Sequence, residues 1–318
     1  FAITADEVFT SSFAPFVLLG PALGAPCVLP DVDVRRPADL DVDRLAEACA
    51  RGPVGVAWLS PASARRIVAT AADRTVPLRL VMLAGAPIDP ELARAVARVT
   101  GGEVRSPYGM TEAMPLTDGV EPDADVPAGG TATGWPLPGV TVVVTPLDDP
   151  HGPARPAGDW GELVIHAPWM RDGYDRRWAT DAAATVERDG ATFHRTGDVG
   201  YLADDGRLVQ LGRAQHVLRT ADGPLASVAV EQPVAAALDR SVAAVGVGPA
   251  GAQVVVVVVA GTGRLRLAEP GLTAAVRDAS AVPVAAVLEG ELPVDVRHQS
   301  KVDRSALAAA ATDLLAGR

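Results

Sequence analysis

Apolar and polar positions follow two alternating patterns along residues 4–107. Continuous apolar runs of strand length occur at Cys27–Leu29, Val54–Leu59 and Leu78–Ala84. Between them we predict helices at Asp6–Leu23, at Asp43–Arg51, after the Ser60-Pro61 cap, and from Asp89-Pro90 to Gly101. Apolar strands that alternate with helices are typical of a parallel sheet covered on both faces.

The pattern changes near Pro122, where short apolar stretches are separated by Gly, Pro and Asp. We predict strands at Val140–Thr145, Gly161–His166, Ala191–His194 and Gly200–Leu211, the last with a turn at Asp204-Asp205-Gly206. Short strands with frequent turn residues indicate an antiparallel subdomain, here a small barrel.

Alternation of strands and helices returns after Gly212-Arg213. Strands are predicted at Ala243–Val247 and Val254–Ala260, and helices at Val228–Leu238, Leu272–Ala279 and Arg304–Leu315. We therefore predict an α/β fold in two domains. Residues 1–212 form a large domain, divided into an α/β part (1–121) and a β-rich part (122–212). Residues 213–318 form a small α+β domain.

Composition narrows the class of protein. The 318 residues include 48% hydrophobic and 21% charged residues, so a folded core is expected. The net charge of −11, with no stripe of Lys or Arg, argues against nucleic acid or an anionic membrane as partner. The longest apolar run, Val254–Ala260, is too short to span a bilayer. Cys27 and Cys49 are expected to be reduced core thiols of a cytoplasmic protein.

Several kinds of site are not indicated. The five histidines show no metal-ligand spacing, so no zinc is predicted. No Gly-x-Ser-x-Gly elbow is present, and the Gly-rich stretch 129–134 lacks the lysine of a P-loop.

The most informative segment is Tyr108-Gly109-Met110-Thr111-Glu112-Ala113-Met114-Pro115. The hydroxyl of Thr111 and the carboxylate of Glu112 could meet the phosphates of a nucleotide and their Mg²⁺. Gly85-Ala86-Pro87 also follows a predicted strand, where ligands collect in α/β sheets, and Tyr108 offers a ring to stack on a base. Taken singly, these segments also fit ordinary tight turns.

Three charged residues complete the candidate set. Asp198, after Thr196-Gly197, could accept hydrogen bonds from ribose hydroxyls, and Arg213 could bind the same ribose. Lys301, in a chain where lysine is nearly absent, could stabilise charge at a carboxylate–phosphate centre. The alternatives are an Asx turn, a surface arginine and a solvated lysine.

In order and spacing, these motifs resemble those of the adenylate-forming superfamily of acyl-CoA synthetases, peptide-synthetase adenylation domains and luciferases. The resemblance covers nearly the whole chain and implies ATP and Mg²⁺ as cofactors. It implies an adenine-side turn at Gly85-Ala86-Pro87 and a nucleotide motif at Tyr108-Gly109-Met110. It also implies an α-phosphate contact at Thr111, Mg²⁺ at Glu112, ribose contacts at Asp198 and Arg213, and a catalytic Lys301 on the mobile C-terminal domain. Gly161-Glu162-Leu163 and Gly173-Tyr174 resemble a structural motif of the barrel.

Two short segments, Tyr108–Pro115 and Arg297–Asp303, are similar in sequence to the corresponding segments of the β-lactone synthetases of bacterial olefin biosynthesis. The resemblance implies that ATP activates a long-chain 3-hydroxy acid, whose hydroxyl then closes a β-lactone with release of AMP. It further implies a hydrophobic hydroxy acid as substrate, with other enzymes of the olefin pathway as possible partners.

Two departures from the superfamily pattern are informative. The phosphate loop with its lysine is absent, so we expect it upstream of Phe1, which makes this chain an incomplete enzyme. The hinge position carries Gln215, and the Ile-Lys-x-x-Gly loop typical of CoA ligases is missing after it. The alternatives are a long-chain fatty acyl-CoA synthetase with an unusual hinge, or a truncated, non-catalytic nucleotide-binding module.

Overall fold

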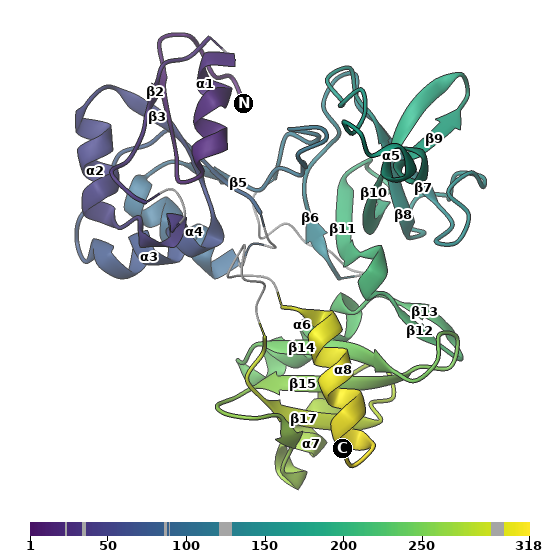
Figure 1. The fold of residues 1–318 in the computed structure, drawn as a ribbon. Helices are drawn as coiled ribbons and strands as arrows, with labels where there is room; N and C mark the ends of the chain where they lie inside the picture. Colours follow the sequence, from purple (N-terminus) through teal and green to yellow (C-terminus); the bar gives the residue numbers. More distant parts are fainter. Residues whose placement is uncertain (23, 34–35, 86–87, 89, 121–128, 294–301) are drawn as a thin grey trace.

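The computed structural model describes residues 1–22, 24–33, 36–85, 88, 90–120, 129–293 and 302–318. Figure 1 shows three groups of elements along the chain: an α/β part, a β-rich part and a C-terminal part. The first two belong to the predicted large domain and the third to the predicted small domain. The placement of the boundary at residues 213–215 stays a prediction.

The α/β part is built on a five-stranded parallel sheet in the order β2-β1-β3-β4-β5. The strands are β1 (Val8–Ser11), β2 (Cys27–Val28), β3 (Val54–Leu59), β4 (Leu80–Leu83) and β5 (Glu103–Arg105). One face packs against α2 (Val42–Ala50), α3 (Pro61–Ala71) and α4 (Pro90–Thr100). Ser60 caps α3 as predicted, because its side chain accepts a hydrogen bond from the Ser63 amide at 3.0 Å.

The predicted helix at residues 6–23 is wrong in its first half. Val8–Ser11 forms β1, between β2 and β3, and only η1 (Ala14–Leu18) and α1 (Leu19–Ala22) are helical. All four residues of β1 are buried, and the aromatic and β-branched side chains of Phe9 and Thr10 suit a strand with neighbours on both sides.

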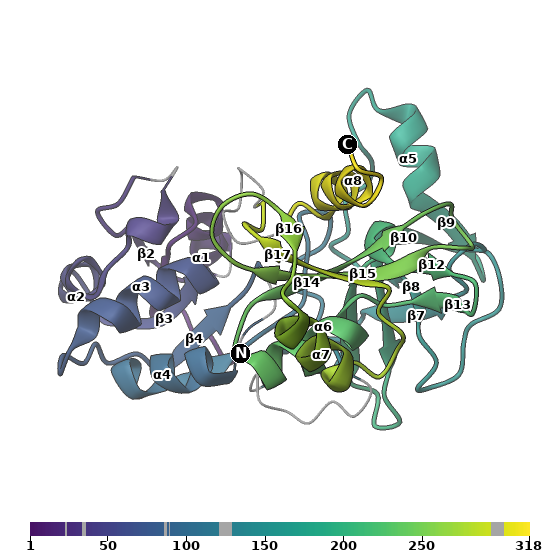
Figure 2. The same ribbon diagram turned by 90° about the horizontal axis from the view of Figure 1, so that it is seen from below.

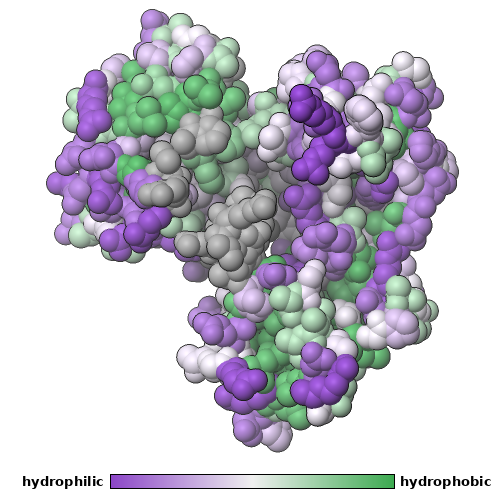
Figure 3. Space-filling model, in the orientation of Figure 1, coloured by the Kyte–Doolittle hydropathy of each residue, from purple (hydrophilic) through white to green (hydrophobic). Residues whose placement is uncertain are grey.

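The second face of this sheet is covered mainly by η1 and α1. Phe16 and Leu19 pack there against a cluster that includes Trp58 and Met82. Figure 3 shows apolar residues gathered on the surface in the area of α1. Leu18, the last residue of η1, is 72% exposed. The sheet therefore has helices on both faces, with the thinner cover on this side.

The β-rich part is a six-stranded antiparallel sheet. Its main path is β6-β11-β10-β8-β7, and β9 pairs with β10. The strands are β6 (Thr131–Ala132), β7 (Thr141–Thr145), β8 (Gly161–His166), β9 (Thr185–Arg188), β10 (Ala191–Leu202) and β11 (Leu208–Arg213), and α5 (Trp178–Ala184) precedes β9. β6 and β7 end the path, and no pairing joins them in the described residues, so the predicted barrel is not closed by strand pairs.

β10 differs from the two separate strands predicted for this segment. It is one 12-residue strand whose pairing with β8 shifts register between Arg195 and Val199. Gly197 lies inside this irregularity with φ of 67°, a left-handed conformation that glycine adopts without steric cost. On the other side of β10, the register with β11 pairs Asp198 with Arg213.

The C-terminal part is a mixed four-stranded sheet in the order β14-β15-β17-β16, as expected of a small α+β domain. Its strands are β14 (Val242–Val247), β15 (Val254–Ala260), β16 (Arg266–Leu267) and β17 (Ala286–Gly290), preceded by the hairpin of β12 (Leu218–Thr220) and β13 (Gly223–Leu225). Figure 2 shows α6 (Val228–Leu238) and α7 (Pro270–Ala279) on one face of the sheet and α8 (Arg304–Leu315) on the other. The short helix η3 (Ala214–His216) leads into this part from β11.

Candidate functional site

The loop that follows β5 joins the α/β part to the β-rich part. Within it, Met110 and Ala113 exchange two backbone hydrogen bonds of 3.0 and 3.1 Å. This bridge closes a tight turn, with Thr111 and Glu112 at its tip. Thr111 is exposed and Glu112 is half-buried, so the hydroxyl and the carboxylate are presented side by side.

Tyr108 connects this loop to Asp198 on β10. Its hydroxyl donates a hydrogen bond of 2.6 Å to Oδ2 of Asp198, 90 residues further along the chain. Burial and the neighbouring Asp198 carboxylate raise the pKa of Tyr108 well above its usual value, so the phenol stays a donor. Tyr108 is only 6% exposed and belongs to a buried apolar cluster. The predicted stacking of its ring on a base stays a prediction.

Asp198 and Arg213 are brought together as the sequence predicted. They lie opposite each other on β10 and β11, and Nε of Arg213 is 3.1 Å from Oδ1 of Asp198. Arg213 also donates a hydrogen bond of 3.1 Å to the carbonyl of Thr196. Asp198 is buried while the side chain of Arg213 is half exposed, so the arginine covers the carboxylate from the solvent side.

Glu112 has a partner that the sequence did not single out. The Tyr174 hydroxyl donates a hydrogen bond of 2.6 Å to Oε1 of Glu112, and the Arg171 amide donates one of 2.8 Å to the Glu112 carbonyl. Burial raises the pKa of Glu112, but hydrogen bonding, above all from the Tyr174 hydroxyl, and the charge of Arg171 outweigh it, so the net pKa is lowered. Glu112 is thus held as a carboxylate.

These additional residues were missed because they are far from the motif in sequence. Tyr174 lies 62 residues from Glu112, in a segment assigned only to the structure of the barrel. A Gly-Tyr pair in a sequence does not by itself indicate a binding or catalytic role. Only the fold reveals the hydrogen bond from Tyr174 to Glu112.

The donor set at Glu112 suits Mg²⁺ bound through a nucleotide. Among the described residues, no group of three or more His, Cys, Asp and Glu side chains could hold a metal ion. Mg²⁺ is commonly bound by one or two carboxylates together with substrate phosphates and water. Glu112 fits that role, because a carboxylate that accepts one phenolic proton retains lone pairs for a cation.

Gly85 lies at the edge of the sheet from which the Tyr108 loop leaves. It follows β4, next to β5, and the carboxyl ends of these parallel strands share one edge. Gly85 has φ of 105°, and a Cβ placed on it would lie 3.7 Å from the Phe13 ring. Met114 of the motif loop packs in the same cluster as Ala84 and Phe13.

Three predicted site residues, Ala86, Pro87 and Lys301, lie outside the described residues. Their predicted roles stay predictions. Gln215 is described: it lies in η3, is exposed, and its Nε2 is 3.2 Å from Nε2 of His216. It therefore lies in the connection between β11 and the C-terminal part.

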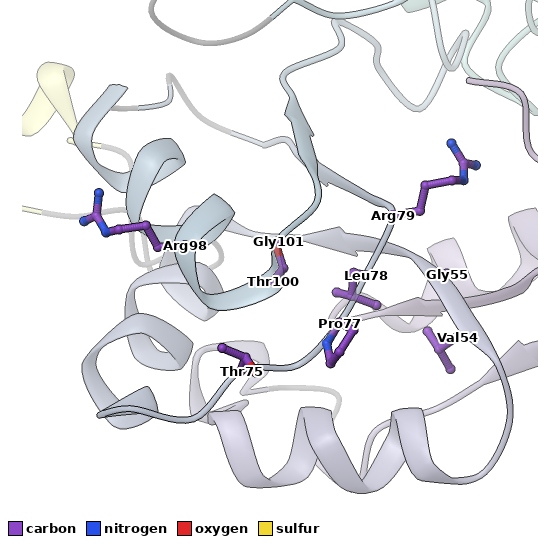
Figure 4. Close-up of a pocket in the computed structure, with 9 residues that line it drawn as sticks. All are labelled: Val54, Gly55, Thr75, Pro77, Leu78, Arg79, Arg98, Thr100 and Gly101. Atoms are coloured by element: carbon purple, nitrogen blue, oxygen red, sulfur yellow. The ribbon is translucent and has the colours of Figure 1, made fainter.

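A depression of the surface in the α/β part lies away from this loop. Figure 4 shows it, about 540 Å³ in volume, lined by Val54 at the start of β3, by Leu78 before β4 and by Thr100 at the end of α4. These are the amino ends of the strands, whereas ligands of parallel α/β sheets collect at the carboxyl ends. We therefore place the candidate site at the Tyr108 loop.

No helix in the described ranges is both long and apolar enough to cross a membrane.

Comparison with known sequences identifies one protein family and several relatives. The profile of the AMP-binding enzyme family matches residues 2–175. An olefin β-lactone synthetase of Stenotrophomonas maltophilia (strain K279a) is 35% identical over 97% of this chain and 60% of the relative. Its counterpart from Xanthomonas campestris pv. campestris is 34% identical over 93% of this chain and 58% of the relative. The chain thus spans about three fifths of the length of these curated relatives.

Solved structures share the fold. ATP-bound MatB from Rhodopseudomonas palustris superposes with a TM-score of 0.74 at 24% identity, covering 98% of this chain and 61% of MatB. The amide bond synthetase McbA from Marinactinospora thermotolerans gives a TM-score of 0.72 at 26% identity, covering 96% of this chain and 62% of McbA. Nearly all of this chain therefore shares its fold with about three fifths of each of these structures.

Proposed function

The chain belongs to the AMP-binding enzyme family, and from this premise we propose that it takes part in the ATP-dependent, AMP-forming activation of a carboxylic acid. The observation that carries the proposal is that one loop is connected to two carboxylates, those of Asp198 and Glu112. Tyr108 holds Asp198 from the start of that loop, and Glu112 lies at its tip. A carboxylate for ribose and a carboxylate for a metal thus come together through a segment of five residues.

In the proposed reaction, the acid carboxylate attacks the α-phosphorus of ATP, an acyl–phosphate bond forms, and pyrophosphate leaves. Asp198 accepts hydrogen bonds from the ribose, and the Thr111 hydroxyl donates to the α-phosphate. Mg²⁺ at Glu112 would offset charge on the phosphates. Lys301 is proposed as the cation at the reacting carboxylate.

We further propose that the product is a β-lactone. In the second step the substrate's 3-hydroxyl attacks the acyl carbon, the bond to AMP breaks, and the hydroxyl proton leaves to solvent. Support comes from the names of two relatives, each of which is called an olefin β-lactone synthetase. The segment after Arg213, with Gln215 at the hinge and no CoA-ligase loop, fits an enzyme whose second nucleophile is part of the substrate.

A hydrophobic acid is the proposed substrate class. Partly buried apolar side chains of Phe13, Ala84 and Met114 lie together beside the motif loop. Apolar surface next to the reacting end favours an alkyl chain, since burying each methylene contributes about 0.8 kcal/mol.

The nucleotide site is tested by AMP binding measured by isothermal titration calorimetry. Asp198→Asn should weaken AMP binding by about tenfold or more, since hydrogen bonds to charged groups contribute about 1.5–3 kcal/mol. Asp159→Asn, an exposed position, is the matched control. Equal AMP affinity in wild type and Asp198→Asn would remove Asp198 from the nucleotide site.

The reaction is tested with ATP, Mg²⁺ and a 2-alkyl-3-hydroxy acid, with and without CoA. We expect AMP, pyrophosphate and a β-lactone detected by mass spectrometry, with no need for CoA. A thioester formed only with CoA would instead establish an acyl-CoA synthetase. AMP binding without any turnover would leave the nucleotide-binding module as the function of this chain.

A further inference from the structure

Tyr174 is tied to the motif loop more closely than the sequence suggests. Its hydroxyl lies 2.6 Å from Oε1 of Glu112, a short distance that is typical of a phenol donating to a carboxylate. The proposed reaction assigns Glu112 to the metal and gives Tyr174 no role. The contact joins the tip of the motif loop to the segment between β8 and α5.

Arg171 fixes the position of the Tyr174 ring. Its guanidinium carbon lies 3.7 Å from the ring centroid, a cation–π contact. Its Nη1 donates to Oδ1 of Asp181 at 2.5 Å, and the Tyr174 amide donates to the same oxygen at 3.3 Å. The ring and the backbone of Tyr174 are therefore held through one carboxylate.

His194 completes the support from β10. Its Nδ1 lies 3.3 Å from Nη2 of Arg171, so the imidazole accepts while the guanidinium donates. Burial and the charge of Arg171 lower the pKa of His194, which favours the neutral, accepting ring. The Arg171 amide also donates a hydrogen bond to the Glu112 carbonyl. The cluster therefore restrains both the backbone and the side chain of Glu112.

This arrangement has two consequences for the Glu112 carboxylate. The phenol restrains one oxygen, which limits the directions in which the other can face. The phenol also occupies one acceptor position of that oxygen, so the remaining lone pairs are the ones left for a cation. Supporting hydrogen bonds of this kind orient metal ligands and typically change metal affinity by about 10–100-fold.

We propose that Tyr174 is a positioning residue for the metal carboxylate Glu112, and that Arg171 holds Tyr174 in place for this purpose. The proposal rests on the proposed function, since it requires Glu112 to bind the cation of a metal–nucleotide complex. It adds two residues that the nucleotide motifs do not include.

The experiment measures the affinity of the protein for Mn²⁺·ATP by electron paramagnetic resonance, and for metal-free AMP by calorimetry. Tyr174→Phe keeps the ring on Arg171 and removes only the hydroxyl. We expect it to weaken Mn²⁺·ATP binding about tenfold and leave AMP binding unchanged. Tyr201→Phe, on β10 in a separate core cluster, is the matched control and should change neither affinity.

A second variant tests the role of Arg171. Arg171→Lys loses the planar group over the Tyr174 ring and should weaken Mn²⁺·ATP binding in the same direction, with AMP binding unchanged.

Glu112→Gln separates the two proposals. If Glu112→Gln leaves Mn²⁺·ATP affinity unchanged, the metal role of Glu112 is wrong and the proposed function loses that element. If Glu112→Gln weakens binding but Tyr174→Phe and Arg171→Lys do not, the positioning role is overturned and the proposed function stands. Equal losses of Mn²⁺·ATP and AMP affinity in Tyr174→Phe would also overturn it, since they would indicate general disruption.

Discussion

At the scale of single residues, the site depends on side chains that hold other side chains. Tyr108 is the clearest case, because its ring packs in the core and its hydroxyl reaches the Asp198 carboxylate. A buried carboxylate needs partners, since an ionised group without hydrogen bonds is costly to remove from water. Tyr108 therefore stabilises both the fold and the orientation of the proposed ribose ligand.

We expect Tyr108→Phe to lower the free energy of unfolding by about 1–3 kcal/mol, because it removes a donor from a buried carboxylate. Urea denaturation followed by circular dichroism measures this change. AMP affinity should fall as well, since Asp198 loses one of its restraints. An unchanged unfolding midpoint would show that solvent replaces the phenol without loss.

At the scale of elements, the β-rich sheet is held by an ion pair between neighbouring strands. Arg195 on β10 donates through Nε and Nη2 to the two oxygens of Glu162 on β8, at 2.9 and 2.8 Å. Glu162 is 2% exposed, whereas Arg195 is 33% exposed. The pair lies beside the register shift of β10, where regular strand pairing is interrupted.

Arg195→Met should lower the free energy of unfolding by about 3 kcal/mol, since it leaves a buried carboxylate without its partner. Arg318→Met, which breaks an exposed pair with Asp313, is the matched control and should change stability by less than about 1 kcal/mol. Chemical denaturation of the two variants under the same conditions compares them. Similar losses in both would mean that the Glu162 pair contributes no more than a surface pair.

The connection η3 is expected to respond to pH through His216. Burial, together with the charges of Arg304 and Arg213, lowers the pKa of His216 to about 4. The unfolded chain takes up this proton nearer pH 6.5. The free energy of unfolding is therefore unaffected by His216 above about pH 6.5. It decreases as pH falls towards 4, by at most about 1.4 kcal/mol per pH unit.

His216→Gln should reduce this loss, which unfolding free energies at pH 7 and pH 4.5 will reveal. His151→Gln, at an exposed position, serves as control and should keep the wild-type pH dependence. If the wild type and His216→Gln lose the same stability on acidification, His216 does not titrate as the structure indicates.

At the scale of the whole molecule, polar contacts within the described residues join the C-terminal part to the β-rich part. The Gln232 side chain on α6 both accepts from the Gly130 amide and donates to the Gly130 carbonyl, each at 2.8 Å. Arg219 on β12 forms an ion pair of 2.8 Å with the exposed Asp148. An apolar cluster that contains Leu211 on β11 and Val217 after η3 also spans the two parts.

We expect Gln232→Ala to speed tryptic cleavage after Arg213 by up to about thirtyfold, because two hydrogen bonds worth about 1 kcal/mol each restrain this arrangement. Timed digestion followed by intact-mass spectrometry measures the rate. Asp278→Ala, on the exposed surface of α7, should leave it unchanged. A wild-type rate in Gln232→Ala would place the restraint on the C-terminal part elsewhere.

Much of the fold follows from patterns within a few residues of the chain. The apolar run Val254–Ala260 is β15, the cap at Ser60 begins α3, and the spacing at Arg304–Leu315 is α8. Helix and strand periodicities are local properties, so the sequence by itself determined most elements and the α/β class. The motif at Tyr108–Glu112 and the candidate Asp198 were likewise recognisable from short spellings.

Only the tertiary structure decided which of these residues meet. Val8–Ser11 is a strand because it lies between two others, and β10 is continuous because Gly197 accommodates a shift in register. Tyr108 reaches Asp198 across 90 residues, and Tyr174 reaches Glu112 across 62. Contacts at such separations depend on the path of the whole chain, which short-range periodicity and residue preference do not encode.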